Sequence, residues 1–123
     1  MSMKKNLPDE LQSLLPLTPA VFFVLFALGE GEKHGYAIMQ ETSRLSDGKF
    51  RMGPGTLYTT LQRLLDLGLI LEVEGVRNAE QPGRRRYYRL TGNGTALLES
   101  ELARMDSVVR LARRRRLVPG TVE

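Results

Sequence analysis

Residues 54–68 read PGTLYTTLQRLLDLG, a segment that begins with proline and ends with glycine. Proline is favoured at the first position of a helix, and glycine is favoured just past its end. The four leucines Leu57, Leu61, Leu64 and Leu65 fall on one side of a helical wheel, as expected for a helix that packs on a core. The pattern therefore predicts an amphipathic helix from Pro54 to about Leu67.

The opposite face of this predicted helix is polar and carries no carboxylate before Asp66. A neutral first turn leaves the unpaired N–H groups and the positive end of the helix dipole open to an anion such as phosphate. Threonine, glutamine and arginine side chains also contact base edges and phosphates in the major groove of DNA. We therefore expect this face to bind DNA; the alternative is an exposed polar face without a ligand. Its residues are Gly55, Thr56, Thr59, Gln62 and Arg63, with Tyr58 and Thr60 on the flanks.

The periodicity changes after this helix. Residues 69–76 and 85–90 are rich in β-branched, aromatic and leucine residues, and a segment of turn-forming residues separates them, which predicts a β-hairpin. Arg84, Arg85 and Arg86 lie where the hairpin loop enters the second strand. Arginines at this position, next to a neutral helix N-terminus, are expected to contact the DNA backbone. A run of charge is also typical of a solvated loop.

Helices are predicted on both sides of these two elements. Residues 8–15 favour a short helix that Pro16 ends. Thr18-Pro19 is a capping and starting signal for a helix that runs to Leu28 and stops at Gly29. This helix is apolar all round, which predicts burial on every side. A polar turn over residues 29–35 leads to a helix over 36–45, and Thr91-Gly92 opens a last helix that extends to about Leu117.

The predicted order of helix, helix, helix, hairpin and long helix is that of a winged helix-turn-helix. The fold class is mainly α with a small β-hairpin, flanked by N-terminal and C-terminal dimerisation helices. We expect an N-terminal arm with a short helix over 1–16, a winged-helix DNA-binding domain over 17–91, a C-terminal dimerisation helix over 92–118 and a tail over 119–123.

The last predicted helix carries an apolar seam with the spacing of a heptad repeat. The seam consists of Leu98, Leu102, Met105, Val109 and Ala112. It is too short for a free coiled coil but adequate for a dimer whose helices also pack on their own domains. We expect dimerisation, because the apolar helix with Phe22, Phe23 and Phe26 also needs to be covered. The alternative is that this last helix packs only on the helices of its own chain.

The amino-acid composition limits the kinds of function that the chain can have. The chain has 123 residues, no cysteine, one histidine (His34) and a net charge of +4. Residues 1–75 hold 7 basic and 9 acidic residues, whereas residues 76–123 hold 11 and 5, so the halves carry net charges of −2 and +6. No segment approaches the roughly 20 apolar residues that span a bilayer. We expect a cytoplasmic protein with a polyanion partner, without a metal, a cofactor, a membrane partner or enzymatic activity.

Four segments together resemble the PadR family of bacterial transcriptional regulators. They are Lys33-His34-Gly35-Tyr36, GPGTLY at 53–58, LLDLGLI at 64–70 and GRRRYYRLT at 83–91. The resemblance covers roughly residues 17–98. It implies a winged-helix homodimer, in most cases a repressor, that binds a palindromic operator in double-stranded DNA and in many cases answers to a small molecule. The short tail is similar to the branch of the family that has a single C-terminal dimerisation helix.

By position, the resemblance implies that the helix starting at Pro54 is the recognition helix. Thr56, Tyr58 and Thr59 would then lie at the DNA, with Arg63 along the outer face. Tyr36 would contact the DNA backbone, and Arg84, Arg85 and Arg86 would form the basic root of the wing. Two features depart from the family pattern. Gly53 stands where many relatives have a capping serine, and the chain has no tryptophan on which a flat ligand could stack.

The sequence thus predicts a homodimeric, sequence-specific DNA-binding regulator, and a repressor rather than an activator. Phe22, Phe23 and Phe26 could line an effector pocket between subunits, but their spacing is more typical of core, so an effector of unknown identity rests on the resemblance alone. The alternative function is a winged-helix module that binds protein. RNA fits less well than DNA, because its deep, narrow major groove does not admit a helix. The run Arg113 to Arg116 is compatible with a role at the helix C-terminus and equally with DNA or partner contact.

Overall fold

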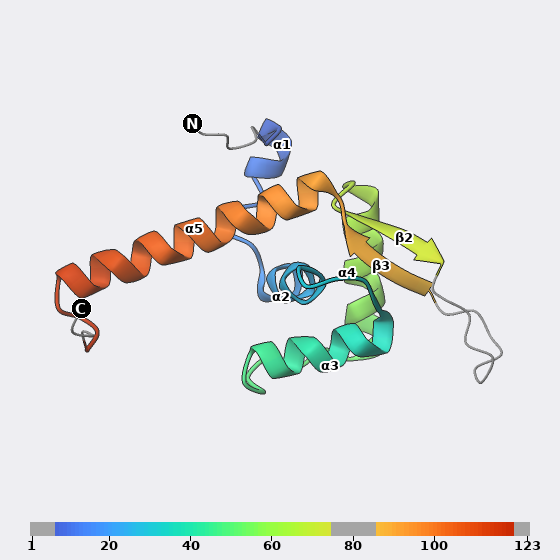
Figure 1. Ribbon diagram of the computed structural model, residues 1–123, viewed down its shortest axis with the longest axis horizontal. Helices are drawn as coiled ribbons and strands as arrows, with labels where there is room; N and C mark the ends of the chain where they lie inside the picture. The colour runs from blue at the N-terminus through green and yellow to red at the C-terminus, as the bar shows by residue number, and fades with distance from the viewer. Residues whose placement is uncertain (1–6, 75–85, 120–123) are drawn as a thin grey trace.

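The computed structural model describes residues 7–74 and 86–119. It is mainly helical with one small antiparallel sheet, as the sequence predicts (Figure 1). In chain order the elements are α1 (Asp9–Gln12), α2 (Pro19–Leu28), β1 (Lys33–His34), α3 (Gly35–Leu45), α4 (Pro54–Asp66), β2 (Ile70–Glu74), β3 (Arg86–Leu90) and α5 (Gly92–Arg114). Helices α3 and α4 form the helix-turn-helix, and β2 and β3 form the base of the wing.

Helix α2 is the centre of the core and has the predicted bounds. The Thr18 hydroxyl accepts a hydrogen bond from the Val21 N–H at 3.3 Å, Pro19 occupies the first position, and Gly29 caps the end. Val24 and Leu25 are fully buried, and α2 contacts α3, α4, α5 and β3. Within one chain, the burial that the sequence predicts on every side of α2 is incomplete on one flank, and the remaining cover is the part expected from dimerisation. Ala20, Phe23 and Phe26 are only partly buried, because the folded chain leaves this flank of α2 without a full cover.

Helices α3 and α4 pack on α2 through their apolar faces. On α3, Ile38 and Thr42 are buried, and the Thr42 hydroxyl donates to the Met39 carbonyl at 2.9 Å. On α4, three of the four predicted leucines are buried, Leu57, Leu61 and Leu64, whereas Leu65 is partly buried. Thr60, expected on the flank of the polar face, is also buried. Helix α4 starts without a side-chain cap at Gly53 and ends before Gly68, whose φ of +74° is easily adopted by glycine.

The sheet contains one strand more than the sequence predicts. The order is β1-β3-β2, with both pairings antiparallel. Lys33 and His34, expected in a polar turn, pair with Tyr88 and Tyr87 of β3. The predicted hairpin strands are present as β2 and β3, in a register that runs from Ile70 opposite Leu90 to Glu74 opposite Arg86. The tip of the hairpin lies outside the described residues.

Helix α5 begins where predicted and ends earlier. The Thr91 hydroxyl accepts from the Gly94 N–H at 3.0 Å and donates to the Gly68 carbonyl at 2.7 Å, which joins the start of α5 to the end of α4. The helix stops at Arg114, short of the predicted Leu117, and Arg116 has a φ of +60°. Its second half extends beyond the rest of the fold (Figure 1).

The N-terminal arm is held against the core. Its helix is shorter than the predicted 8–15, because only Asp9–Gln12 has helical geometry. Leu7 and Leu11 are nevertheless buried. The Leu17 N–H donates to an oxygen of the Glu101 carboxylate at 2.9 Å, although the two residues are 84 positions apart. This bond fixes the end of the arm to α5.

Candidate nucleic-acid interface

The N-terminal ends of α3 and α4 lie close together and present the side chains predicted to bind DNA. Tyr36 on α3 is 62% exposed, and Tyr58 on α4 is 54% exposed. The polar face of α4 is exposed as predicted, at Gly55, Thr56, Thr59 and Gln62. Neither helix has an acidic residue in its first turn. This surface therefore combines two positive helix ends with neutral hydrogen-bonding side chains, an arrangement that suits a phosphate backbone.

Tyr58 is in close contact with the start of α3. A Cβ atom built on Gly35 would lie 2.8 Å from the Tyr58 hydroxyl oxygen and 3.4 Å from Tyr58 Cζ. The tyrosine side chain therefore occupies the space that any larger residue at position 35 would need. The sequence indicated neither this contact nor the importance of a glycine at this position.

The root of the wing adds one described arginine to this surface. Arg86 lies on β3, with its side chain 74% exposed, and its Nε is 3.3 Å from a Glu72 carboxylate oxygen on β2. Burial raises the pKa of the neighbouring Tyr88, and the negative charge of Glu72 raises it further. At neutral pH the Tyr88 hydroxyl is thus a neutral hydrogen-bonding group beside Arg86. Arg84 and Arg85, the other predicted wing arginines, lie outside the described residues.

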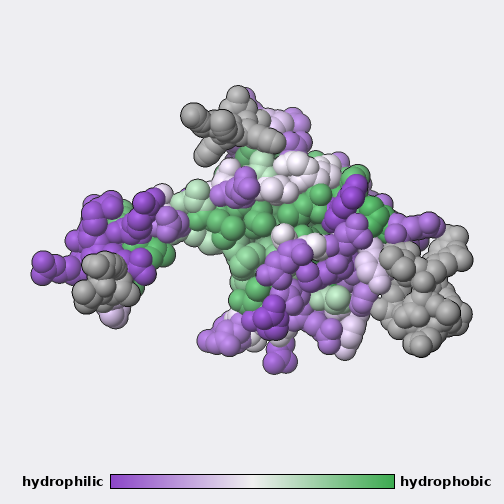
Figure 2. Space-filling model, in the orientation of Figure 1, coloured by the Kyte–Doolittle hydropathy of each residue, from purple (hydrophilic) through white to green (hydrophobic). Residues whose placement is uncertain are grey.

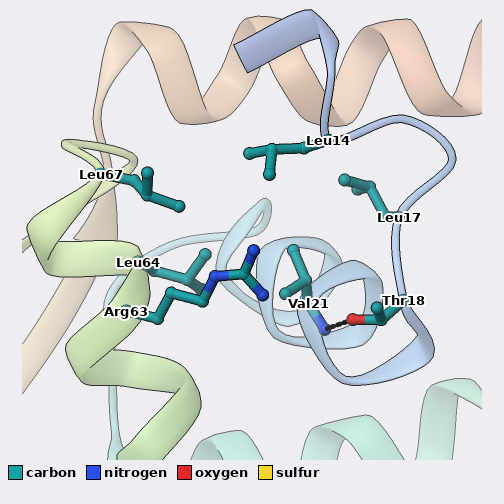
Figure 3. Close-up of a pocket in the computed structure, with 7 residues that line it drawn as sticks. All are labelled: Leu14, Leu17, Thr18, Val21, Arg63, Leu64 and Leu67. Carbon is teal, nitrogen blue, oxygen red and sulfur yellow. Dashed lines mark hydrogen bonds between the residues drawn. The ribbon is translucent and has the colours of Figure 1, made fainter. Parts of the chain in front are cut away.

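Arg63 does not point where the sequence predicted. It is exposed on the last turn of α4, but its guanidinium is directed over a pocket toward α2 (Figure 3). The pocket is lined by Leu14, Leu17, Thr18, Val21, Arg63, Leu64 and Leu67 and has a volume of about 30 Å³. A pocket of this volume has no room for a drug-sized effector. On the same turn, Gln62 Nε2 donates to Asp66 Oδ1 at 2.9 Å.

The predicted dimerisation residues fall into two groups. Phe22 and Leu98 are buried within the chain, so little of their surface is left for a partner. Phe23, Phe26, Met105 and Ala112 are partly buried, whereas Leu102 and Val109 are 37% and 41% exposed. Figure 2 shows a hydrophobic band over α2 and the adjoining part of α5. Further exposed apolar residues near the end of α5 lie off the predicted seam, namely Val108, Leu111, Leu117 and Val118.

Glu101 is a buried residue that the sequence did not single out. It is completely buried and accepts from Arg104 Nε at 2.6 Å as well as from the Leu17 N–H. The hydrogen bond from Arg104 lowers the pKa of Glu101 below its ordinary value, although burial acts in the opposite direction. Glu101 therefore stays ionised at neutral pH and holds the arm in place.

Neither a metal centre nor a membrane span is found in the described part of the chain. Residues 7–74 and 86–119 contain no group of three or more histidine, aspartate or glutamate side chains that could hold a metal ion. Within the same ranges, no helix has the length and apolar character needed to cross a bilayer.

Comparison with known proteins decides the family. Residues 24–100 match the family model described as "Transcriptional regulator PadR-like family". A transcriptional regulator of Mycobacterium tuberculosis is 34% identical over 87 residues, which cover 71% of this chain and 76% of the relative. The chain belongs to the PadR-like family of transcriptional regulators. Membership confirms the resemblance seen in the sequence and the expectation of a regulator rather than an enzyme.

Solved structures agree on the fold. A PadR-like regulator from Bacillus cereus matches 93% of this chain and 100% of its own, with a TM-score of 0.65 and 20% identity. Bacillus subtilis PadR, solved in complex with operator DNA, matches 84% of this chain and 52% of its own, with a TM-score of 0.59 and 22% identity. At these identities the likeness concerns the winged-helix fold and its long C-terminal helix.

The relatives differ in length. The chain spans 21% of the length of a 37.1 kDa transposon protein of Streptomyces fradiae, to which it is 43% identical over 82 residues. The shared segment is thus found in proteins of quite different size.

Proposed function

We propose that this PadR-family chain is a cytoplasmic repressor that binds a palindromic operator in double-stranded DNA as a homodimer. The observation that carries the proposal is the exposed, acid-free first turn of α4 beside Tyr36 at the start of α3. In winged-helix proteins this helix enters the major groove, and its first residues contact base edges. Bacillus subtilis PadR was solved in complex with operator DNA, which supports DNA as the partner of this chain.

Specificity and affinity have different sources in this proposal. Thr56, Tyr58 and Thr59 project from the first half of α4, where they would contact base edges. Arg86 and the neighbouring Arg84 and Arg85 would neutralise phosphates and release counterions, which gives affinity that falls with salt and depends little on sequence. Tyr36 would contact the DNA backbone next to α4.

The exposed apolar surface of α2 and α5 supports the proposed homodimer. Soluble monomers rarely leave a continuous apolar patch of this kind in water. A second copy related by a two-fold axis would cover Phe23, Phe26, Leu102 and Val109 with their own counterparts. Such a dimer presents two copies of α4, which would fit two half-sites about one helical turn apart.

The pocket beside Arg63 gives no support for a small-molecule effector. The pocket beside Arg63 has a volume of about 30 Å³, whereas sites for small molecules enclose about 300–1,000 Å³. Release of the DNA by an effector is therefore proposed from family resemblance alone.

The test is selection of bound sequences from a pool of random double-stranded DNA, followed by affinity measurements at several salt concentrations. We expect an inverted repeat that binds about 1,000-fold more tightly than random DNA. Thr59→Ala should change the selected sequence, whereas Thr95→Ala, an exposed threonine on α5, should leave it unchanged. Weak binding without sequence preference that disappears at physiological salt would overturn the proposal in favour of a protein-binding module.

A further inference from the structure

We propose that Gly35 is a positioning residue for DNA recognition, because its missing side chain allows Tyr58 of the recognition helix to lie against the first residue of α3. The inference rests on the proposed function and adds a residue that sets how the two helices present their side chains to DNA. Gly35 itself is buried and would not contact the DNA.

The geometry leaves no room for a methyl group at position 35. A Cβ there would lie 2.8 Å from the Tyr58 hydroxyl oxygen, a distance that real Cβ contacts essentially never show. The next neighbours, Leu57 Cδ2 and Tyr58 Cζ, would lie at 3.4 Å, which is ordinary van der Waals contact. One atom therefore causes the conflict, and it is the terminal atom of a side chain.

The start of α3 cannot easily move away from Tyr58, because the sheet and a cap hold it. His34 lies on β1 and pairs with Tyr87 of β3, and its ring packs edge-on against the Tyr87 ring with centroids 5.4 Å apart. His34 Nδ1 also accepts from the Ala37 N–H at 3.3 Å in the first turn of α3. An added methyl group would therefore displace the Tyr58 side chain rather than the backbone of α3.

Displacement of Tyr58 matters because the ring is exposed on the surface proposed to meet DNA. Its position on α4 lies between Leu57, which is buried in the core, and Thr59, which faces outward. A methyl group at position 35 would push the Tyr58 hydroxyl away from the start of α3 and so change the position from which the ring meets DNA. Contacts to bases depend on such positions within fractions of an ångström.

The test is a double-mutant cycle of Gly35→Ala and Tyr58→Phe, measured on the operator selected by the unmodified chain. Gly35→Ala should lower operator affinity about tenfold, which is within the range of one good base contact, with little change in thermal stability. Tyr58→Phe removes the conflicting oxygen, and its own affinity is the reference against which the double variant is compared. The double variant should return to the affinity of Tyr58→Phe alone, because the ring regains its place beside the new methyl group.

Gly92→Ala is the matched control. Gly92 is also the first residue of a helix, and a Cβ there meets nothing within 4 Å. It should leave operator affinity unchanged, which separates the steric effect from a general effect of alanine at a helix start.

The outcomes distinguish this inference from the proposed function. If the unmodified chain selects an operator but Gly35→Ala binds it equally well, the positioning role is wrong and the DNA-binding function stands. If Gly35→Ala weakens binding and Tyr58→Phe does not restore it, the loss does not pass through the Tyr58 hydroxyl, and the inference is again wrong. If no operator is selected at all, the proposed function itself fails.

Discussion

The second half of α5 is richer in apolar residues than the first, yet it is the half that the rest of the chain does not cover. From Gly92 to Glu101 the helix is packed into the core, and Ala96, Leu97 and Leu98 are buried there. From Leu102 onward the apolar side chains are largely exposed, with Val108 at 54% and Val109 at 41%. Burial within one chain thus specifies the fold of the first half, whereas the second half leaves apolar surface exposed, which we propose that a second copy covers.

The largest expected effect is on the packed half. A Cβ on Gly94 would lie 2.0 Å from the Leu69 carbonyl oxygen, and this obstacle is backbone that cannot turn aside. Gly94→Ala should therefore lower the free energy of unfolding by about 3 kcal/mol, as overpacking of a tight core does. Denaturant unfolding followed by circular dichroism measures this free energy. Gly92→Ala is the control, because a Cβ at position 92 meets nothing within 4 Å. An unchanged midpoint for Gly94→Ala would mean that α5 does not approach Leu69 so closely.

A charge in the exposed half should break the dimer and spare the fold. Val109→Glu places a carboxylate on the apolar surface, and its burial in an interface is costly. We expect the dimer dissociation constant to rise on the order of a hundredfold, with the helical circular dichroism signal kept. Sedimentation equilibrium measures the constant. Ser107→Glu adds the same charge at an exposed position two residues earlier, on the opposite side of the helix, and should leave the dimer intact.

Glu101 lies at the border between the two halves of α5, and its contribution to the free energy of unfolding should depend on pH. The hydrogen bond from Arg104 is the main cause that lowers its pKa below the ordinary 4.5. A lowered folded-state pKa means that the stabilisation is complete above the ordinary pKa and is lost as pH falls through the lowered value. Glu101→Gln should therefore destabilise the chain by about 2 kcal/mol at pH 7.

The difference in free energy of unfolding between Glu101→Gln and the unmodified chain should become smaller at acid pH. Unfolding measured from pH 7 to pH 3 tests this, and Glu99→Gln, an exposed residue on the same helix, is the control. A difference that stays constant over this range would contradict an ionised, paired Glu101.

The smallest expected effect concerns the wing. Arg86 forms an ion pair with Glu72, with the arginine Nε 3.3 Å from a carboxylate oxygen. Because both side chains are substantially exposed, the ion pair contributes less than about 1 kcal/mol to stability. Glu72→Gln should free Arg86 for phosphate and raise affinity for random DNA by about threefold at low salt. Fluorescence anisotropy measures this, with Glu99→Gln as a charge-matched control outside the interface. Equal gains in affinity for Glu72→Gln and Glu99→Gln would show that only the net charge of the chain affects binding to random DNA.

Local signals explain which parts of the fold could be predicted. The bounds of α2 were predicted correctly because Thr18, Pro19 and Gly29 act on their immediate neighbours. The two-residue strand β1 was missed because Lys33 and His34 become a strand only by pairing with Tyr88 and Tyr87, far along the chain.

The same contrast applies to the candidate site. The exposed face of α4 follows from helical periodicity and could be predicted. The direction of Arg63 could not, because it depends on the pocket that α2 and the N-terminal arm form beside it. The burial of Glu101 also depends on a distant contact, the Leu17 N–H. Sequence periodicity predicts which side of an element is polar, but long-range packing decides what each polar side chain contacts.

Hydroxyl-radical footprinting of the selected duplex shows how many separate stretches of DNA the bound protein protects and how far apart they lie. We expect two protected patches on one face of the DNA, with centres about 10 base pairs apart. Val109→Glu should reduce protection at both patches together at low protein concentration. A single patch for the unmodified chain, or uniform protection along the duplex, would contradict a dimer that reads two half-sites with α4.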